Sequence, residues 1–186
     1  MPALLNHIDP NGLEEFSVVF TDRSLNHMSK EFQKVMCDLS SNLKEVYNAN
    51  AVVLVPGGGT FAMEAVARQF GIEANVMVIR NGWFSYRWSQ IFESSSNARS
   101  TTVLKARMIG NEPLAPFRPA EVDEVIKKIK ADKPDIVFAP HVETSAGVIL
   151  PDDYIKKVAA AAHDVGALMV LDLSLIHISE PTRPLY

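Results

Sequence analysis

The chain of 186 residues lacks several features that mark particular classes of protein. Its single cysteine, Cys37, excludes a disulfide within the chain and favours a reducing compartment. No apolar run reaches the roughly 20 residues of a membrane span, and the opening segment has no basic start and no long apolar run of a secretory leader. Lysine and arginine are scattered and the net charge is −4, which argues against nucleic-acid binding. We therefore expect a cytoplasmic protein with no membrane or nucleic-acid partner.

Short apolar runs alternate with amphipathic segments along the chain, and this pattern predicts an α/β fold. We expect strands at 51–55, 75–80, 101–105, 135–140 and 167–172, and helices at 30–47, 60–70, 84–95, 120–131 and from Pro151 to near Gly166. The strands are apolar on both faces, which is typical of a mostly parallel sheet with helices on both sides. Ser29 is expected to cap the first helix, whose apolar stripe should pack on a core.

Unusual residues follow four of the predicted strands. "PGGGT" (56–60) follows the first, "NGWF" (81–84) the second and "HVETSAG" (141–147) the fourth, while Asp172 ends the fifth. In a parallel α/β sheet, ligands bind beyond the carboxyl ends of the strands. The four segments therefore predict one shared site.

The glycine-rich segment favours a ligand that approaches the backbone closely. Gly58 and Gly59 carry no side chain, and Thr60 opens the next helix, whose free amides suit a phosphate. A tight strand-to-helix turn is the simpler interpretation. Gly57, Gly59 and Ala62 also match the G-x-G-x-x-A pattern of a dinucleotide-binding loop, with Arg80 placed to meet the 2′-phosphate of NADP.

The other strand ends offer an aromatic surface, hydroxyls and a carboxylate. Phe84, with Trp83 beside it, either stacks on a flat ring or packs in the core. Thr144 and Ser145 either donate hydrogen bonds to a ligand or form a plain loop. Asp172 follows a buried run and needs a partner, which a cationic ring nitrogen would supply; a cap or loop carboxylate is the alternative.

No metal site is expected. His141 and Glu143 are the nearest candidates, and neither has partners at the spacing that metal ligands require.

Together these motifs resemble the class V aminotransferases, in particular their alanine–glyoxylate aminotransferase-like branch. The matching stretches are "VPGGGTFAMEAVARQF" (55–70), "RNGWFSYRW" (80–88), "APHVETSAGVILP" (139–151) and "GALMVLD" (166–172). The resemblance implies part of the large domain of the aspartate-aminotransferase-like fold (fold type I), with pyridoxal 5′-phosphate as cofactor. It also implies a homodimer that transfers an amino group between a small amino acid and a 2-oxo acid such as glyoxylate or pyruvate. A class V lyase or desulfurase, and a non-catalytic binding module, remain alternatives.

The resemblance also implies a role for each site residue. Gly58, Gly59 and Thr60 match the loop against the cofactor phosphate, and Phe84 matches the aromatic residue that stacks on the pyridine ring. Thr144 matches the hydroxyl near the O3′ side of the ring. Asp172 matches the catalytic carboxylate that pairs with the pyridine nitrogen.

The end of the chain departs from the family. The lysine that binds the cofactor covalently is expected after Asp172, but residues 173–186 contain no lysine. The eleven residues "LSLIHISEPTR" (173–183) instead match the translation of a transposase-type sequencing adapter. We therefore expect an N-terminal segment (1–23), a partial cofactor-binding domain (24–172) and a non-native tail (173–186). We expect the chain as written to be inactive and marginally stable.

Overall fold

A computed structural model describes residues 27–174 of the chain. The predicted N-terminal segment 1–23 and residues 175–186 of the predicted tail lie outside the described residues. The chain divides into two compact units, Met1–Val55 and Pro56–Tyr186.

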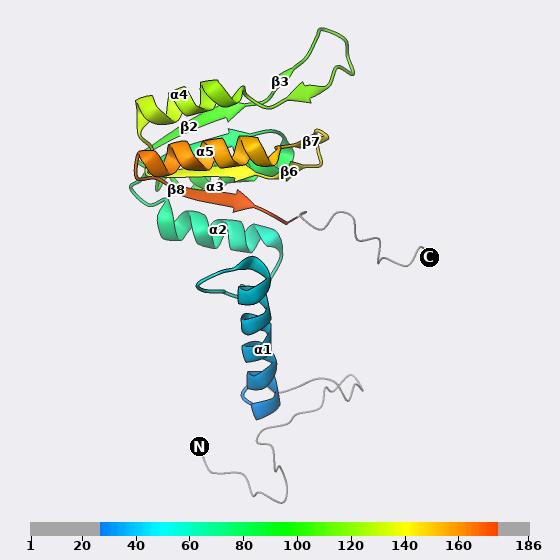
Figure 1. Ribbon diagram of the computed structural model, residues 1–186, viewed down its shortest axis with the longest axis vertical. Helices are drawn as coiled ribbons and strands as arrows, with labels where there is room; N and C mark the ends of the chain where they lie inside the picture. The colour runs from blue at the N-terminus through cyan, green and yellow to red at the C-terminus, as the bar shows by residue number, and fades with distance from the viewer. Residues whose placement is uncertain (1–26, 175–186) are drawn as a thin grey trace, which may run out of the picture. The chain divides into compact units, whose positions relative to one another are not determined.

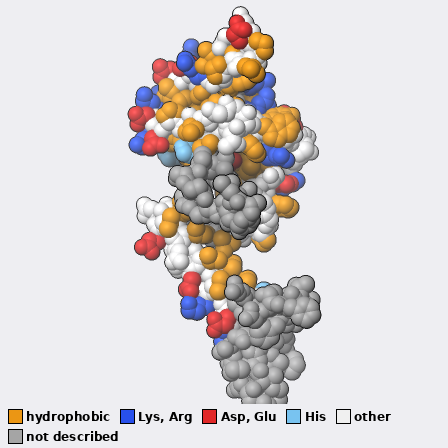
Figure 2. Space-filling view, turned by 90° about the vertical axis from the view of Figure 1, so that its right-hand side faces the viewer, with side chains coloured by type: hydrophobic (Ala, Val, Ile, Leu, Met, Phe, Trp, Pro, Cys, Tyr) orange, Lys and Arg blue, Asp and Glu red, His pale blue; other side chains and the backbone are white. Residues whose placement is uncertain are grey.

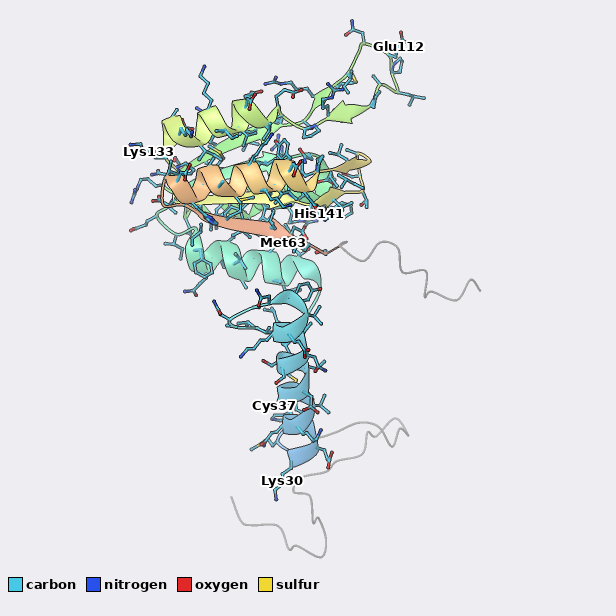
Figure 3. The ribbon with its side chains drawn as sticks, in the orientation of Figure 1. Lys30, Cys37, Met63, Glu112, Lys133 and His141 are labelled. Carbon is cyan, nitrogen blue, oxygen red and sulfur yellow. The ribbon has the colours of Figure 1, made fainter. Side chains whose placement is uncertain are left out.

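The first unit contains the helix α1 (Lys30–Tyr47). The Ser29 hydroxyl accepts a hydrogen bond of 3.1 Å from the amide of Phe32, which confirms the predicted cap. No residue of α1 is buried, so the expected packing of its apolar stripe on a core is wrong for the described residues. The apolar stripe has no partner within its own unit, because α1 is the only element that the structure describes there. Cys37 lies on α1 and is exposed (Figure 3).

The strand expected at 51–55 is also wrong. These residues have no regular structure, and the side chain of Val53 is 82% exposed. A strand needs a neighbour for its backbone amides and carbonyls. Among the described residues, no strand pairs with this segment. Its β-branched composition therefore shows only a preference for an extended conformation.

The second unit alternates helices and strands. Its elements are α2 (Gly59–Phe70), β1 (Asn75–Arg80), α3 (Trp83–Ser95), β2 (Ser100–Lys105), β3 (Arg107–Met108), β4 (Phe117–Arg118), α4 (Val122–Asp132), β5 (Ile136–Pro140), β6 (Val142–Glu143), β7 (Val148–Ile149), α5 (Asp152–Asp164) and β8 (Leu168–Asp172). The four later predicted strands are confirmed to within one residue, and the helices of this unit to within two.

The main sheet has the strand order β2-β1-β5-β8, and all of its pairs are parallel (Figure 1). The register places Pro140 opposite Asp172, so the last residues of β5 and β8 end side by side. Two short antiparallel pairs, β3 with β4 and β6 with β7, lie outside this sheet.

The two central strands, β1 and β5, bury alternate residues on opposite faces of the sheet. Val76 and Val78 of β1 pack with residues of α2 and α3, including Trp88. Met77 and Ile79 pack with residues of α4 and α5. Two apolar cores therefore cover the two faces, which confirms the predicted parallel sheet between helices.

The carboxyl ends of the strands share one edge of the sheet. Figure 3 shows His141, which follows β5, at this edge, and Lys133, which precedes β5, at the opposite edge. Figure 2 faces the carboxyl edge, where hydrophobic side chains are exposed among charged ones. Among residues 27–174, no helix has the length and apolar character needed to cross a membrane.

Candidate functional site

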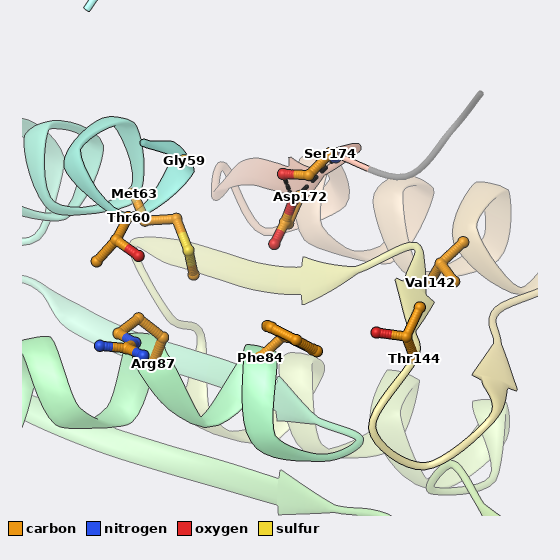
Figure 4. Close-up of a pocket in the computed structure, with 9 residues that line it drawn as sticks. All are labelled: Gly59, Thr60, Met63, Phe84, Arg87, Val142, Thr144, Asp172 and Ser174. Atoms are coloured by element: carbon orange, nitrogen blue, oxygen red, sulfur yellow. Dashed lines mark hydrogen bonds between the residues drawn. The ribbon is translucent and has the colours of Figure 1, made fainter. Parts of the chain in front are cut away.

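A hollow of about 350 Å³ lies at the carboxyl edge of the sheet (Figure 4). Four parts of the second unit line it: the first two turns of α2 and of α3, β6 with the turn after it, and the end of β8 with Ser174. The lining residues are Gly59, Thr60, Met63, Phe84, Arg87, Val142, Thr144, Asp172 and Ser174. Pockets for small ligands start at about 300 Å³, so the hollow is large enough for a small ligand. Five of the six predicted site residues line it, and the sixth, Gly58, immediately precedes α2.

The glycine loop leaves the start of α2 open. Gly57 has a φ of +130°, and a Cβ there would lie 2.8 Å from the ring of Phe61, so this position requires glycine. Gly58 is the N-cap, and no side chain accepts a hydrogen bond from the first amides of the helix. A Cβ at Gly58 would meet nothing within 4 Å. The first amides of α2 thus face space that an anion can enter.

Phe84 stands at the start of α3 with its ring in the hollow (Figure 4). Its side chain is 49% exposed and that of Trp83 is 58% exposed, so neither packs in the core. Trp83 does not line the hollow, and its ring lies against Tyr86 at a centroid distance of 5.9 Å. Of the two predicted aromatic residues, Phe84 is therefore the one that a ligand in the hollow would contact.

The two hydroxyl residues of the turn after β6, Thr144 and Ser145, have different surroundings. Thr144 lines the hollow, and Figure 4 shows its hydroxyl on the side of Phe84. The Ser145 hydroxyl accepts a 2.7 Å hydrogen bond from the amide of Trp83 and donates one to Glu143. Ser145 is thus engaged within the protein, and Thr144 remains available to a ligand.

Asp172 reaches the hollow from the end of β8. Its Oδ1 atom accepts hydrogen bonds from the amide and the hydroxyl of Ser174, at 3.0 Å and 2.6 Å. Oδ2 accepts no hydrogen bond from the described residues, and Figure 4 shows the carboxylate on the side of the hollow opposite Phe84. Ser174 belongs to the segment that we predict to be non-native, so we assign no function to it.

Glu143 is a functional candidate that sequence reasoning considered only as a metal ligand. It is fully buried, and its carboxylate accepts hydrogen bonds from two backbone amides and two hydroxyls. Burial by itself would raise the pKa of this carboxyl, but the hydrogen bonds from Ser145, Ser85 and Phe84 outweigh burial and hold the pKa below its ordinary value. Glu143 is therefore an anion in the folded protein.

Two further lining residues, Met63 and Arg87, were also not predicted. Each lies three residues after a predicted one, Met63 after Thr60 and Arg87 after Phe84, and residues at this spacing share a helix face. Helical spacing from the predicted residues is the signal that identifies them. Among residues 27–174, Arg87 forms no ion pair, and its guanidinium adds a positive charge to the lining of the hollow.

The dinucleotide-binding alternative has little structural support. Its motif requires a strand immediately before the glycines, but residues 51–55 form none. The Arg80 guanidinium lies over the ring of Tyr86, 4.9 Å from the centroid, and 3.4 Å from the Ser89 hydroxyl. Arg80 does not line the hollow.

Comparison with known proteins agrees with this geometry. A family model described as class V aminotransferase matches residues 14–181, and the chain belongs to this family. The predicted family is confirmed. A curated relative from Helicobacter pylori, named only as an uncharacterized aminotransferase, is 28% identical over 149 residues, which are 80% of this chain and 37% of that protein.

Two solved structures show the same fold. Ureidoglycine–glyoxylate aminotransferase from Bacillus subtilis has a TM-score of 0.63 and 25% identity, over 77% of this chain and 34% of that one. Alanine–glyoxylate aminotransferase from Nostoc sp. has a TM-score of 0.63 and 22% identity, over 80% of this chain and 37% of that one. The predicted fold class, part of the fold type I large domain, is confirmed. The chain spans about a third of the length of these relatives.

Proposed function

We propose that this chain is the cofactor-binding part of a pyridoxal-phosphate aminotransferase. The observation that carries the proposal is the convergence of α2, Phe84, Thr144 and Asp172 on one hollow at the carboxyl edge of the sheet. These parts provide amides for an anion, an aromatic face, a hydroxyl and a carboxylate. A phosphorylated, flat and basic ring offers a partner to each of them.

The start of α2 would hold the phosphate. Gly58 and Gly59 leave the backbone accessible, and the positive end of the helix dipole favours an anion there. The Thr60 hydroxyl adds a donor, and the Arg87 guanidinium adds positive charge on the same side of the hollow (Figure 4).

Phe84 and Thr144 would orient the ring. A half-exposed aromatic side chain can cover one face of a pyridine ring without loss of core packing. The Thr144 hydroxyl would donate to the oxygen that the ring carries beside its reactive carbon. Both residues would bind and orient the cofactor without a proton transfer of their own.

Asp172 would hold a proton on the pyridine nitrogen. A carboxylate next to a basic nitrogen favours the protonated form of that nitrogen, and Oδ2 of Asp172 is free to accept its N–H. When bound, the cofactor supplies an electron sink for the bond that breaks at the substrate Cα. Asp172 is the catalytic residue of this part of the protein in our proposal.

For the whole protein we propose amino transfer between a small amino acid and a 2-oxo acid of the glyoxylate or pyruvate type. The names of the relatives from Bacillus subtilis and Nostoc sp., both glyoxylate aminotransferases, support this substrate class. No lysine follows Asp172 in the chain as written, so we expect it to bind the cofactor reversibly and to show no transfer. The homodimer and the cytoplasmic location remain predictions, as does a class V lyase or desulfurase as an alternative activity.

Binding of pyridoxine 5′-phosphate to the 186-residue chain tests the proposal. This analogue lacks the aldehyde, so it does not react with surface lysines. We expect saturable binding by equilibrium dialysis, no binding of pyridoxine without the phosphate, and about tenfold weaker binding by Asp172→Asn. Asp164→Asn, at the end of α5, is the matched control. Failure of the wild type to bind, or saturable binding of NADPH in its place, would contradict the proposal.

We also retain as a prediction that residues 173–186 are not native. The encoding genomic DNA tests it directly. A native sequence that continues past Asp172 to a lysine is the expected result, and an intact genomic "SLIHISEPTR" would contradict it.

A further inference from the structure

The buried Glu143 carboxylate closes the N-terminus of α3. Its Oε1 accepts a hydrogen bond of 3.0 Å from the amide of Phe84, and its Oε2 accepts one of 2.9 Å from the amide of Ser85. The Ser85 hydroxyl donates to Oε2 at 2.6 Å, and the Ser145 hydroxyl donates to Oε1. No lysine, arginine or histidine among the described residues forms an ion pair with Glu143. The hydrogen bonds and the positive end of the α3 dipole therefore stabilise the buried charge.

Gly82 makes this approach possible. A Cβ at Gly82 would lie 2.7 Å from Cγ of Glu143 and would collide with the Ser145 hydroxyl. The φ of Gly82 is 176°, an extended value that any residue adopts, so space is the constraint. The glycine of "NGWF" and the "ETS" of "HVETSAG" are thus two halves of one contact, although they lie about sixty residues apart.

The same contact sets two residues of the hollow. Phe84 donates its own amide to Glu143, and Thr144 is the residue bonded to Glu143 in the chain. The first three amides of α3 all donate hydrogen bonds to Glu143 or Ser145. These hydrogen bonds hold the start of α3 against the β6–β7 turn. Loss of the carboxylate would free both Phe84 and Thr144.

We propose that Glu143 is a positioning residue, a buried anion that caps α3 and holds the Phe84 ring and the Thr144 hydroxyl toward the same hollow. Its chemistry differs from that of the proposed ligand-binding residues, because every acceptor of Glu143 faces protein. The effect on the cofactor rests on the proposed function, whereas the closure of α3 rests only on contacts within this chain.

Glu143→Gln tests the closure without a change in size. A glutamine carries an NH2 group in place of one carboxylate oxygen, so one of the two positions that bind the amides of Phe84 and Ser85 loses its acceptor, and the negative charge is lost from both. We expect hydrogen exchange of these two amides in the full chain to become about tenfold faster. Exchange in the strands β1 and β5 should stay unchanged. Glu93→Gln, an exposed residue on the same helix, is the matched control and should leave all rates unchanged.

Binding of pyridoxine 5′-phosphate separates the inference from the proposed function. We expect Glu143→Gln to bind about tenfold more weakly than the wild type, and Glu143→Asp, which keeps the charge, to recover part of the loss. Unchanged exchange at Phe84 and Ser85 would overturn the closure. Equal affinity of the variant and a binding wild type would overturn the positioning role alone. No binding by the wild type would overturn the proposed function and leave the closure to the exchange result.

A second variant covers the case in which Glu143→Gln does not fold. Ser145→Ala removes the acceptor of the Trp83 amide and one donor to Glu143, and it keeps the carboxylate. We expect about threefold faster exchange at Trp83 and about threefold weaker binding. Wild-type values for both in a folded Ser145→Ala protein would overturn the inference.

Discussion

The two helices that begin at the hollow, α2 and α3, differ in how their N-termini are satisfied. Both helices have a glycine as N-cap, so in neither case does the N-cap residue offer a side chain to the first amides. At α3, the protein supplies its own anion, Glu143, and the Ser145 hydroxyl. At α2, no side chain caps the helix, and a Cβ at Gly58 would meet nothing within 4 Å. The difference indicates that α3 is a fixed support and that α2 is kept for an external anion.

The largest expected effect on ligand binding comes from giving the N-terminus of α2 a carboxylate cap of the kind that α3 has. Gly58→Asp would place a carboxylate at the N-cap, where nothing lies within 4 Å of the new Cβ. We expect binding of pyridoxine 5′-phosphate to weaken on the order of 100-fold, because the new anion takes the amides and repels the phosphate. The free energy of unfolding should rise by a few tenths of a kcal/mol. Equilibrium dialysis and urea denaturation measure the two, and undiminished binding would show that the phosphate does not use α2.

The reverse change disrupts the contact between the N-terminus of α3 and Glu143. Gly82→Ala brings a methyl group against Glu143 and Ser145, and we expect a loss of about 2 kcal/mol in the free energy of unfolding. Gly58→Ala is the matched control and should cost less, below about 1 kcal/mol for a poorer N-cap, because its Cβ meets open space. Urea denaturation of both variants gives the comparison. Equal stabilities would contradict the crowding at Gly82.

Phe84→Ala tests the aromatic face that α3 supports. We expect about tenfold weaker binding of pyridoxine 5′-phosphate, since the ring loses its stacking partner. The free energy of unfolding should change little, because this side chain is half exposed. Trp83→Ala, its neighbour outside the hollow, should bind as the wild type does. Weaker binding by Trp83→Ala than by Phe84→Ala would show that Trp83, and not Phe84, stacks on the ring.

The smallest expected effect is on the pH dependence of stability. The folded pKa of Glu143 lies below its ordinary value of 4.5, so the native state favours the ionised form. Its contribution to stability is present above that ordinary value and is lost as the pH falls through the folded pKa. The wild type should therefore lose more stability than Glu143→Gln between neutral and acidic pH. Parallel urea midpoints for the two proteins across this range would contradict the assignment.

Local sequence patterns predicted most of the second unit. Its four main-sheet strands and its helices follow from spacing and apolar runs within the elements, and the strand ends located the hollow. In the first unit, the Ser29 cap was predicted in the same way. The strand at 51–55 was wrong because a strand depends on a neighbour that a local pattern does not reveal. The role of Glu143 was missed because its partners Phe84 and Ser85 lie 59 and 58 residues away.

Amide exchange of the 186-residue chain with and without pyridoxine 5′-phosphate tests the central claim most directly. We predict new protection at the amides of Gly59 and Thr60 at the start of α2 and at Thr144. The amides of Phe84 and Ser85, already held by Glu143, should change little. Protection centred on Arg80, or no protection at the start of α2, would contradict the account.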